Sequence, residues 1–207
     1  MVGVGRAAAD AQNPRSARYI PFGAEQNCRT VAPLTLRSHG LMPFQIAALS
    51  EAHFVQLHAV ADAVAREARY LAMTEAPPFQ EAAAFYRSVL ATGQCHVALD
   101  AGAVVGWCDV LPVFGESRRH VGVLGIGLAK ECRGRGLGGA LLRAAIDAAW
   151  ARGLTRIELT VREDNGNARR LYEKAGFLHE GIHRRSFLVN GRYVDACAMA
   201  LLKSDGV

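Results

Sequence analysis

VGVLGIGLAKECRGRGLGGALLR, residues 121–143, is the stretch that decides the fold of this chain. It begins with an apolar, β-branched run at 121–128, which predicts a buried strand. A loop with glycines and two arginines follows at 133–139, and apolar residues then recur at helical spacing as far as Arg152. Strand, glycine-rich loop and helix together favour an anion, because the glycine N–H groups and the positive helix N-terminus point the same way. We expect a phosphate or pyrophosphate here.

One motif in this loop suggests a dinucleotide. Gly134, Gly136 and Gly139 match the G-x-G-x-x-G fingerprint, and Glu158 stands where a ribose-binding acid is expected. However, the five residues 129–133 separate the strand from the loop, and too little chain follows for the rest of a doubly wound sheet. We therefore disfavour a dinucleotide site, and a glycine-rich turn without a ligand is the other alternative.

Two blocks of the sequence form a further pattern. The first is Arg133-x-x-Gly136-x-Gly138, and the second is NGNARRLYEKAGF at 165–177, with a predicted strand at 156–161 between them. Together they resemble the GNAT family of N-acetyltransferases, and the first block is similar to the family's Gln/Arg-x-x-Gly-x-Gly/Ala signature. The resemblance implies a GNAT fold of the α+β class, with a central mixed, mostly antiparallel sheet flanked by helices. It also implies that the sheet is splayed at its central strand to admit acetyl-CoA.

The resemblance implies a role for each residue that matches the family's motifs. The pyrophosphate of acetyl-CoA is expected on the glycine-rich loop, formed by Arg133, Gly134, Arg135, Gly136, Leu137, Gly138 and Gly139. The pantetheine arm is expected along Ile126, Gly127 and Leu128, with Asn165 and Asn167 as further contacts. Tyr172 matches the tyrosine that protonates the departing CoA thiolate, since a phenol is protonated at neutral pH.

Several of these residues also have ordinary structural explanations. Asn165 is a favourable helix N-cap, and Tyr172 lies on the apolar stripe of its own helix. The general base stays open among Asp109, His120, Glu158 and Glu163. A thiol nucleophile is disfavoured, because no third residue would orient Cys108 and His120, and direct transfer needs no acyl-enzyme.

Composition and charge narrow the class of protein. The chain has 207 residues and no apolar run long enough to span a membrane, and it lacks a secretory signal pattern. Five scattered cysteines without C-x-x-C spacing indicate a reducing compartment and no metal site, so we expect a cytoplasmic protein. The net charge is −2 over residues 1–117 and +7 over 118–207. A polyanionic cofactor explains this basic half better than nucleic acid, since aromatic residues do not interleave with the basic ones.

The remaining pattern divides the chain into an N-terminal extension (1–40), an acetyltransferase domain (41–203) and a short tail (204–207). Strands are predicted at 43–49, 96–99, 103–111, 184–189 and 193–202, and helices at 50–67, 79–90 and 165–175. Asp100-Ala101-Gly102 and Asn190-Gly191 are hairpin signals between consecutive strands.

The predicted function is the transfer of acetyl from acetyl-CoA to a primary amine of a small molecule, by direct attack in a ternary complex that releases CoA. The segment 184–199 resembles bacterial GNAT enzymes that act on free amino acids and related amines. Residues 67–78 would wall the acceptor site, where Arg69 could pair with a carboxylate. The alternatives are a protein N-terminal acetyltransferase and a non-catalytic acyl-CoA-binding module. The family also suggests a homodimer.

Overall fold

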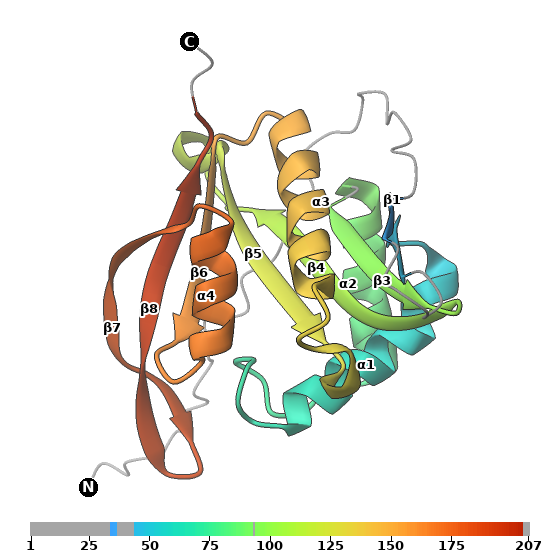
Figure 1. Cartoon of the computed structure of the whole chain (residues 1–207), viewed down its shortest axis with the longest axis horizontal. Helices are drawn as coiled ribbons and strands as arrows, with labels where there is room; N and C mark the ends of the chain where they lie inside the picture. Colours follow the sequence, from blue (N-terminus) through green and yellow to red (C-terminus); the bar gives the residue numbers. More distant parts are fainter. Residues whose placement is uncertain (1–33, 37–43, 93, 205–207) are drawn as a thin grey trace, which may run out of the picture.

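A computed structural model describes residues 34–36, 44–92 and 94–204. In this part of the chain, helices are inserted between groups of strands (Figure 1). The strands are Leu34–Leu36 (β1), Phe44–Ala48 (β2), Cys95–Asp100 (β3), Ala103–Pro112 (β4), Val121–Leu128 (β5), Arg156–Arg162 (β6), Leu178–Val189 (β7) and Arg192–Leu202 (β8). The helices are Phe54–Arg66 (α1), Phe79–Thr92 (α2), Leu137–Ala151 (α3) and Gly166–Lys174 (α4). In this part of the chain no helix is long and apolar enough to cross a membrane.

All these strands form one sheet, in the order β1-β2-β3-β4-β5-β6-β8-β7. Every neighbouring pair is antiparallel except β5 and β6, which run parallel. The two faces of the sheet are covered by different helices, α3 and α4 on one face and α1 and α2 on the other (Figure 1). The predicted α+β class and the mixed, mostly antiparallel sheet are therefore confirmed.

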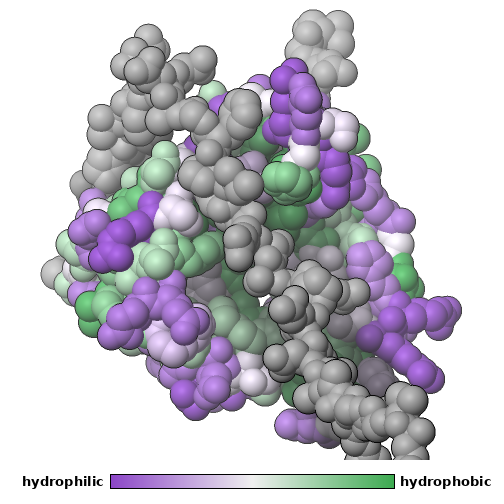
Figure 2. All heavy atoms as spheres, turned by 180° about the vertical axis from the view of Figure 1, so that it is seen from behind, coloured by the Kyte–Doolittle hydropathy of each residue, from purple (hydrophilic) through white to green (hydrophobic). Residues whose placement is uncertain are grey.

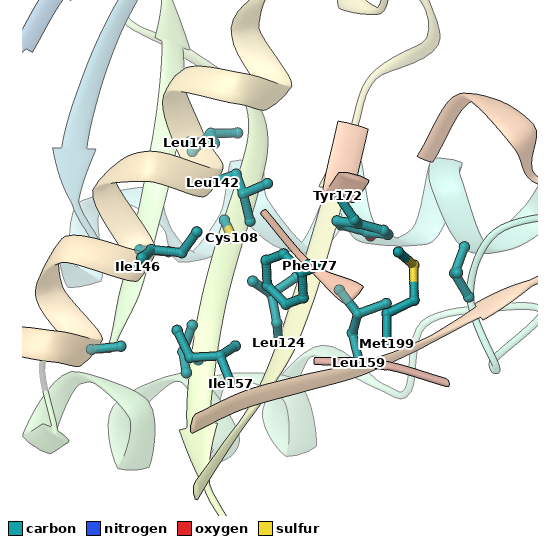
Figure 3. Close-up of a cluster of buried hydrophobic side chains, with 14 of the residues drawn as sticks. Cys108, Leu124, Leu141, Leu142, Ile146, Ile157, Leu159, Tyr172, Phe177 and Met199 are labelled. Carbon is teal, nitrogen blue, oxygen red and sulfur yellow. The ribbon is translucent and has the colours of Figure 1, made fainter. Parts of the chain in front are cut away.

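Each face has its own apolar core. Cys108, Leu124, Leu141 and Phe177 belong to the core under α3 and α4, which Figure 3 shows. Leu57, Val64, Val97 and Trp107 belong to the core under α1 and α2. Side chains alternate between the two faces along β4, so Cys108 and Asp109 point to opposite sides of the sheet.

The sheet opens between β5 and β6. Only the first residues of β5 pair with β6, in the register Val121↔Arg156, Gly122↔Ile157 and Val123↔Glu158. Beyond Val123, β5 pairs with β4 and β6 pairs with β8, and the two strands diverge (Figure 1). One edge of β5 from Leu124 to Leu128 thus has no neighbouring strand in the described part of the chain, which confirms the predicted splay.

Local turn signals place most of the elements correctly. Asn190 and Gly191 both have positive φ (49° and 73°), which a type I′ turn requires, and they join β7 to β8. Ala101 and Gly102 likewise join β3 to β4 with positive φ. Gly176 has a φ of 92° just after α4, as a helix stop requires.

Three expectations need correction or lie beyond the description. The helix predicted from residue 50 begins as a 3₁₀ turn, Glu51–His53, and is α-helical only from Phe54. β7 begins six residues earlier than predicted; most of its residues are exposed, so no alternation of polar and apolar residues marks its start. Within the predicted extension 1–40, β1 pairs with β2, and the other residues of the extension lie outside the described residues.

Candidate active site

The loop after β5 presents unpaired backbone donors. Gly134 and Gly136 have φ of 75° and 80°, a region that favours glycine, and nothing lies within 4 Å of where a side chain would begin at either. No acceptor in the described part of the chain receives the N–H groups of residues 134–138. Gly136 is the N-cap of the fifteen-residue helix α3, so its positive end lies at this loop. The loop has the geometry of an anion site, and the pyrophosphate of acetyl-CoA fits its chemistry.

Other glycines of the motif are explained by close packing. A side chain at Gly138 would come 3.3 Å from both Leu128 of β5 and Leu171 of α4. At Gly127 it would meet the Trp107 ring at 2.2 Å, because that ring lies over the glycine. These two glycines let α3 and the Trp107 ring approach the opening between β5 and β6. The buried Leu137 anchors the first turn of α3 in the core.

Arg133 is turned away from the open loop. Its guanidinium donates to the Leu128 carbonyl (Nε 3.0 Å, Nη2 2.8 Å) and forms an ion pair with Glu67, with Nη1–Oε2 at 2.8 Å. It also lies 4.6 Å from the centre of the Tyr70 ring. The Arg133 guanidinium holds the pKa of the Glu67 carboxyl below its usual value. In this structure Arg133 binds the segment after α1, and its charge is neutralised there.

A second arginine, Arg162, binds the segment after α1 from the β6 side of the opening. Arg162, at the end of β6, is only 7% exposed and donates to the Ala68 carbonyl at 3.1 Å. Its guanidinium also forms a two-point ion pair with Asp164 (Nη2–Oδ2 2.7 Å, Nε–Oδ1 3.0 Å). Ala68 itself has a positive φ of 49°, a strained value for a non-glycine residue. The segment that follows α1 is thus held on both sides, by β5 through Arg133 and by β6 through Arg162.

A cavity of about 270 Å³ lies beside this segment. Residues of the α1–α2 connection and of the N-terminal end of α4 line it: Arg69, Tyr70, Asp164, Asn165, Gly166, Asn167 and Arg170. A wider hollow of about 430 Å³ shares Asp164 and extends to Tyr193 and Asp195 of β8. On the face seen in Figure 2, polar side chains predominate at the right, where β7 and β8 lie.

The two asparagines predicted to contact the cofactor, Asn165 and Asn167, both line the smaller cavity of about 270 Å³. Asn165 is the N-cap of α4, and its Oδ1 accepts from the Ala168 N–H at 3.2 Å. Asn167 Oδ1 accepts from Arg170 Nη2 at 2.6 Å. Each side-chain oxygen therefore has a local partner, and each amide nitrogen keeps its two N–H groups available as donors.

Tyr172 lies in the core between α4 and β5. It is 7% exposed, and its ring centre is 5.8 Å from that of Phe177 (Figure 3). Burial raises the pKa of the Tyr172 phenol well above its ordinary value, and the nearby Cys108 thiol raises it further. The hydroxyl has no hydrogen-bond partner among the described residues. Its proton is thus retained at neutral pH and is free to be donated.

The structure separates the four candidate bases. Glu158 pairs with Arg118 (2.7 Å) and Arg156 (3.2 Å), and its carboxylate is thereby neutralised. His120 precedes β5, at the end of that strand opposite the glycine-rich loop. Glu163 lines the wider hollow, and Asp109 lies mostly buried on β4 beside the opening. Glu163 and Asp109 are the two that stay as candidates.

The opening between β5 and β6 gathers most of the predicted residues. The free edge of β5, the glycine-rich loop, the N-terminus of α4 and Tyr172 all border it. Sequence reasoning missed Glu67 and Arg162, since no local pattern marks a charged residue whose partner is distant in sequence. In the described residues the cysteines are buried and free, and no group of three His, Cys, Asp or Glu side chains could hold a metal ion.

Comparison with known proteins tests the family. The model of the acetyltransferase (GNAT) family matches residues 57–177. The L-amino acid N-acetyltransferase AaaT of Escherichia coli K12 is 40% identical over 109 residues, which are 52% of this chain and 67% of that protein. The N-alpha-acetyltransferase RimI of Mycobacterium tuberculosis is 34% identical over 110 residues, 53% of this chain and 68% of that protein.

A solved structure supports the same fold. YncA of Salmonella typhimurium, determined with its cofactor acetyl-CoA, superposes with a TM-score of 0.74 at 18% identity. The match covers 79% of this chain and 96% of that one, which extends the likeness well beyond the two motifs. Because the family model covers more than half of the sequence, the chain belongs to the GNAT family and is an acetyl-CoA-dependent acetyltransferase.

Proposed function

We propose that this acetyltransferase moves the acetyl group of acetyl-CoA onto the primary amine of a small molecule that also carries a carboxylate, such as a free amino acid. One observation carries the proposal: Tyr70, which lines the smaller cavity with Arg69 and Arg170, lies 4.6 Å from the Arg133 guanidinium of the loop with unpaired N–H groups. The donor and the acceptor would thus meet at the opening between β5 and β6.

Residues of the chain itself would hold the donor. The N–H groups at Gly134 to Gly138 would receive its pyrophosphate, with the α3 N-terminus adding partial positive charge. The exposed guanidinium of Arg135, which lies over the Phe44 ring at 4.5 Å, is the nearer source of full positive charge, because Arg133 is paired with Glu67. Backbone groups of Ile126, Gly127 and Leu128 would pair with the amides of the arm. Acetyl-CoA supplies the thioester that the amine attacks.

The charges of the smaller cavity favour an acceptor with a carboxylate. Arg69 is exposed and forms no ion pair in the described part of the chain, whereas Asp164, the one carboxylate lining this cavity, is already paired with Arg162. A guanidinium without an ion-pair partner is suited to a carboxylate, and two arginines would repel a polyamine. These contacts support an amino acid over a spermidine-like acceptor.

Two alternatives stay open. An N-terminal acetyltransferase is suggested by the likeness to RimI, and it would bind the first residues of a peptide in the hollow near Tyr193 and Asp195. A module that binds acyl-CoA without turnover is the second alternative, and the retained Tyr172 counts against it. A cytoplasmic location, a homodimer and the domain boundaries 1–40, 41–203 and 204–207 stay predictions.

The experiment combines binding and turnover. Titration calorimetry with acetyl-CoA, CoA and NAD should show binding of the first two and none of NAD. A thiol-release assay should then show turnover with free amino acids, weaker turnover with their carboxamides, and little with spermidine or with N-terminal peptides. Turnover on peptides alone would establish the N-terminal activity instead. Binding of acetyl-CoA without release of thiol on any amine would establish the non-catalytic module.

A further inference from the structure

Asp109 occupies an unusual place for a carboxylate. It lies on β4, opposite Gly125 of β5, and its side chain leaves the sheet on the face covered by α1 and α2. A side chain at Gly125 would begin 2.9 Å from the Asp109 Oδ1 atom, so the carboxylate leans over the neighbouring strand. Since Gly125 belongs to the part of β5 that has no β6 partner, the carboxylate reaches toward the opening.

Tyr172 borders the same opening from the other face. The Cys108 thiol acts on the Tyr172 phenol, and Cys108 pairs with Ile126 of β5, whereas Asp109 pairs with Gly125. Since Cys108 and Tyr172 belong to the core under α3 and α4, Asp109 and Tyr172 lie on opposite faces of the sheet. Asp109 and Tyr172 thus flank the unpaired edge of β5. One of them can receive a proton from the acceptor amine and the other can donate a proton to the departing thiolate.

The surroundings of Asp109 favour the protonated, uncharged form of its carboxyl. Tyr86 of α2 and Cys95 of β3 lie on the same face of the sheet as Asp109, whereas the side chain of its neighbour Cys108 lies on the other face. None of the three carries a positive charge. Burial raises the pKa of Asp109 to about 7, and the backbone N–H of Gly125 lowers it by a smaller amount. No titratable group of α1 acts on it. A base with a pKa near the working pH is well matched to a proton transfer from an ammonium group.

We propose that Asp109 is the general base of this acetyltransferase, which rests on the function proposed above. Asp109 takes a proton from the ammonium group of the acceptor, and the freed nitrogen lone pair attacks the acetyl carbon. As the new C–N bond forms, the C–S bond breaks and Tyr172 donates its proton to the departing sulfur. The acylated nitrogen loses its second proton to water, which leaves the neutral amide. Proton exchange with water then returns Asp109 to its carboxylate and Tyr172 to its phenol.

The decisive variant is Asp109→Asn, compared with Asp147→Asn on the exposed surface of α3 and with Glu163→Gln in the wider hollow. We expect Asp109→Asn to bind acetyl-CoA like the wild type in calorimetry but to lose about 100-fold or more in kcat/KM for the acceptor at pH 7. In the wild type, kcat/KM should rise with pH through a pKa near 7. This rise should be absent from Asp109→Asn and present in the other two variants. A loss of this size in Glu163→Gln, with Asp109→Asn unaffected, would assign the base to Glu163.

A second measurement does not depend on turnover. Carboxyl ¹³C NMR of the aspartate-labelled full chain should show one aspartate that titrates near pH 7 and that is missing from Asp109→Asn. If every aspartate of the wild type titrates below about pH 5, the proposed role is wrong even if acetyl transfer is observed. If the NMR signal is present but no amine is acetylated by the wild type, it is the proposed function that fails, and this role with it.

Discussion

The Arg133 guanidinium and the Glu67 carboxylate form a two-point ion pair that joins the cofactor loop to the segment after α1, with Nη1 and Oε2 2.8 Å apart. Both side chains are 27% exposed, so the pair is only partly screened by water. The same guanidinium holds the Leu128 carbonyl, at the end of the β5 edge that would bind the donor. The segment after α1, which would line the acceptor site, and β5, which would bind acetyl-CoA, are therefore held together by the Arg133 side chain.

Glu67→Gln tests this connection. We expect a loss of about 1–2 kcal/mol of unfolding free energy, or about 2–8 °C in Tm, because Arg133 keeps its bonds to Leu128 but loses its counter-charge. The KM for the acceptor should rise several-fold while the Kd of acetyl-CoA stays within about twofold of the wild type. Calorimetry and steady-state kinetics measure both. Glu75→Gln, at an exposed pair 3.6 Å from Arg66, is the matched control and should change neither.

Gly136→Ala and Gly102→Ala form a second matched pair. Both glycines have φ close to 80° and open space around them, so alanine at either position costs a similar amount, about 1 kcal/mol, of backbone strain. Only Gly136 lies in the loop with unpaired N–H groups. We expect Gly136→Ala to weaken acetyl-CoA binding at least tenfold in calorimetry and Gly102→Ala to leave it unchanged. Equal binding by the two variants would contradict the assignment of the loop.

The sequence predicts the elements whose signals are local. Asn190-Gly191 specifies its hairpin, and Asn165 caps α4 as a short polar side chain before a helix should. The ion pair of Arg133 could not be predicted from the sequence, because its partner Glu67 is 66 residues away and only the folded chain brings them together. The sequence places Asp109 among four candidate bases but does not single it out, since its burial depends on Tyr86 and Gly125 of other elements.

Tyr172→Phe tests the general acid. Its hydroxyl has no partner in the described structure, so removing it should change stability by less than about 1 kcal/mol. We expect kcat to fall about 100-fold with unchanged acetyl-CoA affinity, because a proton donor in the transition state is lost. Burial raises the pKa of this phenol, so it stays protonated up to at least pH 10 and should cause no loss of wild-type activity below that pH. An unchanged kcat in the variant would remove Tyr172 from the mechanism.

Arg69→Gln tests the acceptor class. If Arg69 pairs with the acceptor carboxylate, its loss should cost about 1.5–3 kcal/mol of binding, which is about a 10- to 100-fold rise in the KM of an amino acid. The KM of the corresponding amino acid amide should change little, and so should the Kd of acetyl-CoA. Arg87→Gln, which removes an exposed arginine on α2 from a 3.6 Å pair with Glu51, provides the control. Equal rises for the acid and the amide would mean that Arg69 does not recognise the carboxylate.

The buried carboxyl of Asp109 also predicts a dependence of stability on pH. Its pKa is about 7 in the folded chain and near 3.8 when unfolded, so folding favours the neutral form. The stability that this neutral form contributes is present below pH 3.8 and is lost as the pH rises through 7. Asp109→Asn cannot ionise and escapes this loss. Its unfolding free energy relative to the wild type should therefore grow by about 2–3 kcal/mol between pH 5 and pH 8, as measured by urea unfolding at each pH. Any pH-independent change in unfolding free energy caused by the amide in Asp109→Asn is the same at every pH and so does not affect this trend. The control Asp147→Asn should show the same pH dependence as the wild type. A difference that stays constant with pH would mean that the Asp109 carboxyl is already charged in the folded protein at pH 5.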